Sequence, residues 1–328
     1  MSFVVHYGSP VYDLWINPKT QFVLSAFATV VLLYGLRNLS LFIWCFVQPG
    51  RLQQYCHSES GSWALVTGAS DGIGRGFVDE LLEHGFNVLL HGRNQEKLRR
   101  IRDELVQKHP RRTIDFVVAD ASSNDHPEDA VVEKVKNLPG KLVILVNNVG
   151  GIHGHPQFRR FDAVPPAEID WQINTNARFP TQLTRAVLPL LLQNKPALIL
   201  NCGSVGGTIG IPYLTAYTAT KGYIHSFTQS LKTELVAEEQ ASEIEVMGFV
   251  IGNVLSAGNT GELWPFTITA RQCARGCLAR IGSGQTLAYA HWRHGVQIAL
   301  MSALSERHRQ KAIIPAMRKR KEEDEKSR

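Results

Sequence analysis

Short apolar runs alternate with longer amphipathic segments through most of the 328-residue chain, and this alternation constrains the fold more than any other feature. The apolar runs lie at residues 64–67, 87–91, 113–118, 142–146, 197–200 and 243–250. Helical patterns fill the intervals: from a glycine-rich turn to about residue 84, at 94–108, at 127–138, within 166–192, and onward to about residue 238. Apolar strands separated by helices form parallel sheets that are covered on both faces. We therefore expect an α/β fold with a Rossmann-type doubly wound parallel sheet.

Composition favours a globular core and argues against a nucleic-acid partner. Hydrophobic residues make up 44% of the chain and charged residues 20%, which is enough apolar material for a proper core. The net charge of +6 comes without a long basic block interleaved with aromatics, so no nucleic acid is expected. Of the five cysteines, only Cys273 and Cys277 lie at helical spacing, and no second ligand pair follows, so no metal site is expected.

A long apolar stretch near the N-terminus predicts attachment to a membrane. Residues 22–36 are uncharged and apolar, Arg37 and Asn38 interrupt, and residues 39–47 resume the apolar run. Joined across Arg37, the two runs are long enough to span a bilayer. We expect a membrane-anchor helix at about 22–47 within an N-terminal segment 1–61 that ends in a polar linker. A re-entrant or interfacial anchor stays open, and a signal peptide is disfavoured because no small-residue cleavage site follows.

The turn after the first expected strand predicts a dinucleotide site. Its glycines allow a pyrophosphate to approach the backbone, and the following helix offers its N-terminal amides. An ordinary glycine-rich turn is the alternative, and the spacing differs from Gly-x-Gly-x-x-Gly. The residues expected to bind the cofactor here are Gly68, Ser70, Gly72, Ile73 and Gly74.

Residues at the ends of the next strands indicate which dinucleotide is bound. The second strand is followed by Arg93 and not by the acidic residue of an NAD site, so we expect Arg93 to meet the 2′-phosphate of NADP(H). A solvated arginine at a helix start is the alternative. Asp120 follows the third strand, where the adenine would lie, and Asn148 lies in a polar turn after the fourth.

Tyr217 and Lys221 are one helical turn apart and therefore lie on the same face of a helix. A tyrosine hydroxyl is a weak acid near neutrality, and a nearby ammonium favours its phenolate and so assists proton transfer. Ser204, on a glycine-rich turn upstream, offers a hydroxyl that could hold a substrate carbonyl. An exposed aromatic residue with a solvated lysine would give the same pattern.

Taken together and in this order, these motifs resemble those of the short-chain dehydrogenase/reductase family. The resemblance implies that Ser204, Tyr217 and Lys221 are catalytic together with an asparagine, for which Asn176 fits better than Asn174. It also implies hydride transfer between NADP(H) and a ketone or alcohol, with Tyr217 as the acid and Lys221 on the nicotinamide ribose. A homodimer is compatible with it.

More narrowly, the chain resembles membrane-bound very-long-chain 3-oxoacyl-CoA reductases and their beta-hydroxysteroid dehydrogenase relatives. Asp71 in the glycine turn, Val149 and a late Trp292-x-His294 carry this resemblance together with the N-terminal anchor. It implies an endoplasmic-reticulum membrane protein with a cytosolic catalytic domain at 62–310. A charged tail at 311–328, with a basic run at 318–321, is expected to be solvated; a lipid-facing role is the alternative.

The chain departs from the family pattern where the substrate would lie. Ile251-Gly252 replaces the usual proline after the sixth strand, although Val254 and Ser256 are still expected to reach the nicotinamide carboxamide. The substrate lid, at about 252–285, lacks the usual lysine-containing run, and Trp264 and Phe266 are expected to line an apolar pocket.

Three functions remain open at this point: a 3-oxoacyl-CoA reductase, a dehydrogenase of steroid or specialised-metabolite ketones, and a catalytically silent cofactor-binding scaffold. The complete set of Ser, Tyr, Lys and Asn argues against the scaffold. His153 and His155 lie in a loop beside the expected cleft, and we interpret them as loop histidines because the sequence shows no acidic partner for either ring.

Overall fold

The computed structural model describes residues 17–57, 61–240, 243–256, 259 and 265–326. It divides the chain into two units, Met1–Gln48 and Pro49–Arg328. In the first unit, helix α2 (Pro18–Val47) continues through Arg37 without a break. Its most apolar 18-residue window has a mean hydropathy of 1.8 and is only 6% buried, so it is unlike the core helix of a soluble protein. At about 1.5 Å per residue it is long enough to cross a bilayer.

The second unit is built on a seven-stranded sheet in which every neighbouring pair is parallel, as expected. The strand order is β3-β2-β1-β4-β5-β6-β9. The strands are β1 (Ser62–Thr67), β2 (Asn87–Gly92), β3 (Ile114–Val118), β4 (Lys141–Asn147), β5 (Ala197–Cys202), β6 (Ile244–Val250) and β9 (Leu287–Tyr289). The order reverses between β1 and β4, and open α/β sheets bind ligands at such a switch point.

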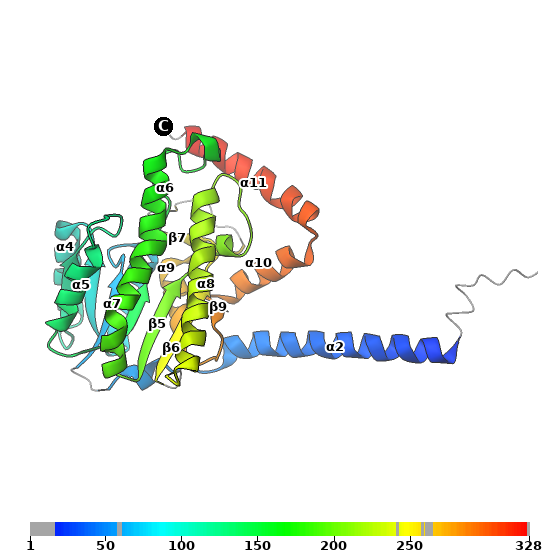
Figure 1. Cartoon of the computed structure of the whole chain (residues 1–328), viewed down its shortest axis with the longest axis horizontal. Helices are drawn as coiled ribbons and strands as arrows, with labels where there is room; N and C mark the ends of the chain where they lie inside the picture. The colour runs from blue at the N-terminus through cyan, green and yellow to red at the C-terminus, as the bar shows by residue number, and fades with distance from the viewer. Residues whose placement is uncertain (1–16, 58–60, 241–242, 257–258, 260–264, 327–328) are drawn as a thin grey trace, which may run out of the picture. The chain divides into compact units, whose positions relative to one another are not determined.

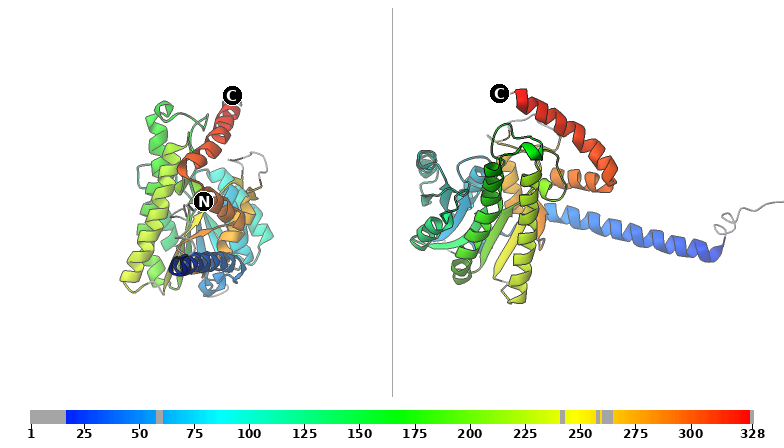
Figure 2. Two further views of the ribbon diagram at one scale, coloured as in Figure 1. Left: turned by 90° about the vertical axis from the view of Figure 1, so that its right-hand side faces the viewer. Right: turned by 45° about the horizontal axis from the view of Figure 1, so that its top comes forward.

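Helices cover both faces of this sheet (Figures 1 and 2). One face packs against α3 (Gly72–Glu83), α4 (Gln95–Lys108) and α9 (Ala270–Ala279). The other packs against α5 (Pro127–Lys136), α7 (Phe179–Gln193) and α8 (Thr215–Ala237). Successive residues of β1 alternate between the two cores, because side chains along a strand point to opposite faces: Ala64 and Val66 join one, Trp63 and Leu65 the other.

Several smaller elements lie outside the expected pattern. Strands β7 (Val254–Leu255) and β8 (Ile268–Thr269) form a separate pair in the lid. Helix α6 (Pro166–Ile173) leads into a π-helical turn, η3 (Asn174–Arg178), and short 3₁₀ turns are η1 (Leu52–Tyr55), η2 (Phe161–Ala163) and η4 (Val205–Gly207). After β9 come α10 (Trp292–Ala303) and α11 (Glu306–Lys326).

The expected polar linker and the expected solvated tail both bury side chains within the second unit. In the expected linker, Leu52 and Tyr55 are buried in the core, and the Tyr55 hydroxyl donates a hydrogen bond to Glu245 Oε2 at 2.5 Å. The expected charged tail belongs to helix α11, in which Met317 is buried. Both expectations rested on local polarity, which does not register contacts made with distant parts of the chain.

Candidate active site

The glycine turn between β1 and α3 is tightly folded and leaves no room for a side chain at Gly74. Gly68 has φ +62°, a conformation that favours glycine, and a Cβ at Gly74 would lie only 2.1 Å from the Gly68 carbonyl oxygen. Asp71 caps α3 by accepting a hydrogen bond from the Gly72 amide at 2.6 Å. The turn therefore brings the N-terminus of α3 and bare backbone to the carboxyl edge of the sheet, where a pyrophosphate fits.

Asn148 fixes this turn to the end of β4. Its Nδ2 donates to the carbonyl oxygens of Thr67 at 2.9 Å and Gly68 at 3.3 Å. The Thr67 hydroxyl in turn accepts from the amides of Asn148 at 2.9 Å and Val149 at 3.0 Å. Asn148 thus stabilises the shape of the glycine turn, and its predicted contact with a cofactor stays a prediction.

Arg93 lies directly after β2, is exposed, and has no hydrogen bond or ion pair with any other residue that the structure describes. Its guanidinium is therefore available to an anion. Asp120, at the end of β3, accepts two hydrogen bonds from Ser122, at 3.0 Å from the amide and 2.8 Å from the hydroxyl. Partial burial would raise the pKa of Asp120, but these bonds and the charge of Arg93 hold it below its usual value.

The sequence interpretation missed Lys97, which lies in the first turn of α4. Its Nζ is 2.9 Å from Asp71 Oδ2, and this ion pair joins α4 to the mouth of the glycine turn. The hydrogen bond from Lys97 lowers the pKa of Asp71, with a further contribution from the Gly72 amide. The four-residue spacing of Arg93 and Lys97 could have indicated this, because it puts two cations around the start of one helix.

Ser204 and Lys221 are both fixed to the end of β5. Ser204 caps η4, with its Oγ accepting from the Gly206 amide at 3.1 Å. Lys221 is buried, and its Nζ donates to the Cys202 carbonyl oxygen at 2.9 Å. The same Nζ lies 5.8 Å from the centroid of the Tyr217 ring. Tyr217 and Lys221 are thus neither an exposed aromatic nor a solvated lysine, because the lysine joins the tyrosine's helix to the strand end that carries the serine.

Asn176 lies in the π-helical turn η3, and such turns are frequent at functional sites. Its Oδ1 accepts from the Gly151 amide at 2.8 Å and its Nδ2 donates to the Gly151 carbonyl oxygen at 2.9 Å. A Cβ built on Gly150 would lie 2.6 Å from Asn176 Oδ1 and 3.3 Å from Lys221 Nζ, so both polar groups border one small space. Asn174 is turned away and donates to the Ser122 carbonyl oxygen at 3.1 Å.

The lid approaches the glycine turn through Ser256, whose Cβ lies 3.1 Å from the position that a Cβ on Gly72 would take. Val254 is buried in β7, and Phe266 is half-buried. The expected role of Trp264 falls outside the described residues, and contact of Val254 and Ser256 with a nicotinamide stays a prediction.

The Ile251-Gly252 departure is accommodated without a proline. Ile251 is buried in the core, and its carbonyl oxygen accepts from the Val205 amide at 2.8 Å, next to Ser204. The backbone of Gly252 lies against the buried ring of His294, since a Cβ there would be 2.6 Å from Cδ2 of that ring.

The expectation that neither loop histidine has an acidic partner is wrong for His155. Its Nδ1 lies 3.4 Å from Asp324 Oδ1, a residue of α11 that is far away in the sequence. His153 stacks on Trp171 with ring centroids 4.6 Å apart. Both rings therefore hold the loop after β4 in place.

The fold and these motifs place the chain in a known family. The profile described as short chain dehydrogenase matches residues 62–263, and the chain belongs to this family. It is an oxidoreductase that acts on C=O or CH–OH groups with a nicotinamide dinucleotide, NAD(P)(H).

Three individual proteins show how similar this chain is to members whose activity or structure is known. The very-long-chain 3-oxoacyl-CoA reductase of Aspergillus terreus is 32% identical over 284 residues, which are 84% of this chain and 76% of that protein. A 3-ketoacyl-(acyl-carrier-protein) reductase from Brucella melitensis, solved with NADH, is 28% identical with a TM-score of 0.60, covering 71% of this chain and 97% of that chain. L-Sorbose reductase from Gluconobacter frateurii, solved with NADPH and L-sorbose, is 21% identical with a TM-score of 0.61 and covers 70% and 94%. At that identity the likeness shows the fold alone.

Proposed function

We propose that this protein is an NADPH-dependent reductase of 3-oxoacyl-CoA thioesters, with Tyr217 as the proton donor. The observation that carries the proposal is the position of Lys221. Its Nζ donates to the Cys202 carbonyl oxygen and lies over the Tyr217 ring, so one buried cation is fixed between the helix of the tyrosine and the strand end of the serine.

The proposed roles follow from these positions. A bound nicotinamide supplies the hydride. Tyr217 gives a proton to the oxygen of the reacting carbonyl, and Ser204 Oγ donates a hydrogen bond to that oxygen as its charge develops. Lys221 assists proton release by placing positive charge beside the tyrosine. Asn176 and Lys221 both approach Gly150, and Asn176 would hold a water molecule there that carries protons onward.

The residues present fit an NADP(H) cofactor. The glycine turn is too tight to take a side chain at Gly74, so bare backbone and the N-terminus of α3 would face the cofactor. Arg93 is the free cation at the end of β2 that a 2′-phosphate would pair with, and no acidic residue stands there for the ribose hydroxyls of NAD. Gly68, Ser70, Gly72, Ile73 and Gly74 would hold the pyrophosphate, with Asp120 beside the adenine and Val254 and Ser256 beside the nicotinamide.

The names of the relatives support the substrate class and the location. Identity of 32% over 84% of the chain links it to a very-long-chain 3-oxoacyl-CoA reductase, which favours an apolar acyl substrate. The exposed apolar helix α2 supports a membrane protein. We place it in the endoplasmic reticulum, with a catalytic domain at about 62–310 facing the cytosol.

NADPH oxidation by the detergent-solubilised full chain tests the proposal. A long-chain 3-oxoacyl-CoA and a steroid ketone are compared in parallel, and we expect turnover of the thioester only. Turnover of the steroid alone would move the protein to hydroxysteroid metabolism. Tight NADPH binding with no turnover of any ketone would mean a catalytically silent scaffold.

A further inference from the structure

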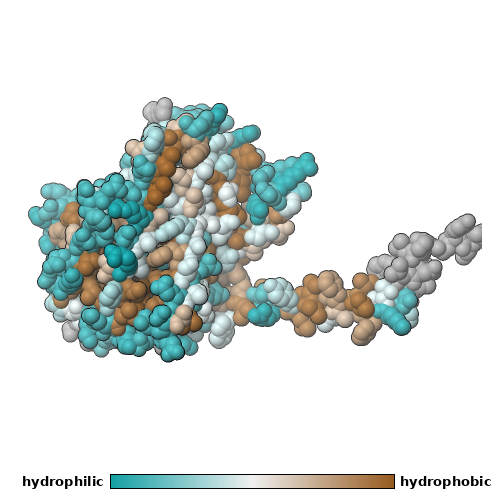
Figure 3. Space-filling view, viewed as in Figure 1, coloured by the Kyte–Doolittle hydropathy of each residue, from teal (hydrophilic) through white to brown (hydrophobic). Residues whose placement is uncertain are grey.

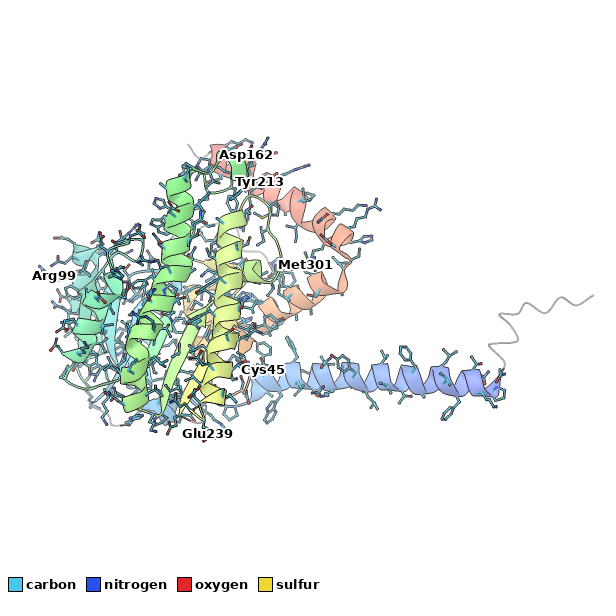
Figure 4. All side chains as sticks on the ribbon, in the orientation of Figure 1. Cys45, Arg99, Asp162, Tyr213, Glu239 and Met301 are labelled. Carbon is cyan, nitrogen blue, oxygen red and sulfur yellow. The ribbon has the colours of Figure 1, made fainter. Side chains whose placement is uncertain are left out.

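Helix α11 is fixed to both loops that flank the candidate active site. In its C-terminal half, Asp324 Oδ2 accepts from the Phe158 amide at 3.0 Å, in the loop after β4. Lys321 Nζ lies 5.9 Å from the centroid of the Tyr213 ring, in the loop between Ser204 and Tyr217 (Figure 4). This half of α11 therefore connects the loop after β4 with the loop between Ser204 and Tyr217.

The N-terminal half of α11 faces the same loop across a groove. Proline lies inside the helix at position 315, and a proline within a helix removes a backbone donor and bends it. Ile313 and Ile314 are half-buried on the inner side, opposite Ile209 and Pro212. Between them is a cavity of about 210 Å³. Apolar residues gather beneath α11 in the space-filling view (Figure 3).

Both aliphatic and polar residues line the groove. Glu306, Arg309 and Gln310 form part of its lining, and Gln310 Nε2 donates to Glu306 Oε1 at 3.2 Å. Its aliphatic members, Ile209, Pro212, Ile313 and Ile314, offer an apolar surface that suits a chain of methylene groups.

The loop wall of the groove follows Ser204 closely in the chain. Its loop wall begins at Thr208, directly after η4, which Ser204 caps. A Cβ on Gly206 would lie 3.5 Å from Ser204 Oγ and 3.4 Å from Ile211 Cδ1, so aliphatic surface begins beside the serine hydroxyl. A carbonyl held by Ser204 could therefore extend an attached chain along this loop toward Ile313 and Ile314.

We infer that the groove between α11 and residues 208–212 holds the acyl chain of the substrate, and that Ile313 and Ile314 determine which chain lengths are reduced. The inference rests on the proposed reductase function. It gives the charged C-terminal helix a role in substrate selection.

The test fills the groove and compares two chain lengths. Ile314→Trp is assayed with acetoacetyl-CoA and with a 3-oxo thioester of about eighteen carbons, using the detergent-solubilised full chain. We expect kcat/KM for the long thioester to fall at least about tenfold, the change that corresponds to two methylene groups no longer buried. The value for acetoacetyl-CoA should stay within about twofold, with NADPH binding unchanged. Ile313→Trp should act in the same direction, so that the inference does not depend on one variant.

Ala312→Trp is the matched control, because Ala312 adjoins the two isoleucines but lies on the exposed face of α11. It should affect neither substrate. An equal loss for both thioesters with Ile314→Trp would mean that the coenzyme A portion, and not the acyl chain, occupies the groove. No loss for either thioester would mean that the substrate does not enter the groove. Both results overturn the inference while the reductase function stands. No turnover of either thioester by the wild type would instead sink the proposed function, and with it the occupant named here.

Discussion

Asn176 and Gly151 exchange two hydrogen bonds, from the Gly151 amide to Asn176 Oδ1 at 2.8 Å and from Asn176 Nδ2 to the Gly151 carbonyl oxygen at 2.9 Å. The asparagine is 1% exposed and comes from a π-helical turn, so the chain departs from regular helix geometry at the point where this side chain meets the loop after β4. The pair fixes one wall of the space that Lys221 also borders.

Asn176→Ala should therefore lower kcat about tenfold or more, because two half-buried backbone groups of Gly151 lose their partner and the loop beside Lys221 loosens. Asn174→Ala is the matched control, since Asn174 is hydrogen-bonded to the Ser122 carbonyl oxygen, away from Gly150. Steady-state assays of both variants check the prediction, and equal effects would show that position in the π-helical turn matters more than the Gly151 pair.

Arg93→Ala should raise KM for NADPH about 10- to 100-fold and leave KM for NADH nearly unchanged. The expected loss is that of a charged hydrogen bond to phosphate. Arg99→Ala, on the exposed side of α4, serves as control for the change in net charge (Figure 4). If Arg93→Ala raised KM for NADPH and for NADH by the same factor, the guanidinium would not be binding the 2′-phosphate.

Gly74→Ala should abolish cofactor binding or weaken it by at least about tenfold, because its Cβ would overlap the Gly68 carbonyl oxygen and force the turn apart. Gly210→Ala meets nothing within 4 Å and should bind NADPH like the wild type. Titration of NADPH fluorescence measures both, and normal binding by Gly74→Ala would show that the turn is not the pyrophosphate site.

His91 should make the fold sensitive to acid. Burial lowers the pKa of its ring to about 4, whereas the unfolded chain takes up this proton near pH 6.5. Protons are therefore gained on unfolding between these values, so stability is complete above about pH 6.5 and decreases as pH falls toward 4. The loss from this ring is about 2 kcal/mol at pH 5.

Thermal unfolding at pH 7 and pH 5 measures that loss. The His91→Leu variant, which cannot take up the proton, should show a smaller decrease between the two pH values than the wild type. The same decrease in both proteins would assign the acid sensitivity to other groups.

The sequence was sufficient for those parts of the fold that rest on local patterns. Strands β1, β4 and β5 carry runs of four or five apolar residues, and β2, β3 and β6 carry shorter runs of two or three. The glycine turn and the Tyr217–Lys221 pair are short motifs whose geometry follows from the adjoining strand or helix. Strand β9 has only three residues, Leu287–Tyr289, and such a run has no periodicity to detect.

Contacts between distant segments could not be predicted in this way. The bond from the Phe158 amide to Asp324 spans 166 residues, and a charged C-terminal segment carries no local sign that one of its acids will hold a loop. The same limit hid the burial of Tyr55 and its hydrogen bond to Glu245. The π-helical turn was also missed, because the sequence pattern of residues 174–178 is that of a regular α-helix.

The proposed role of Tyr217 is tested most directly by the single-turnover reduction of a long-chain 3-oxoacyl-CoA by NADPH-loaded wild type and by Tyr217→Phe. The variant keeps the ring beside Lys221 and loses only the hydroxyl, so NADPH should bind with unchanged affinity. General acid catalysis is worth about 10²- to 10⁴-fold, and the rate of NADPH consumption should fall by that amount. A variant that consumed NADPH at the wild-type rate would contradict the assignment of Tyr217 as the proton donor.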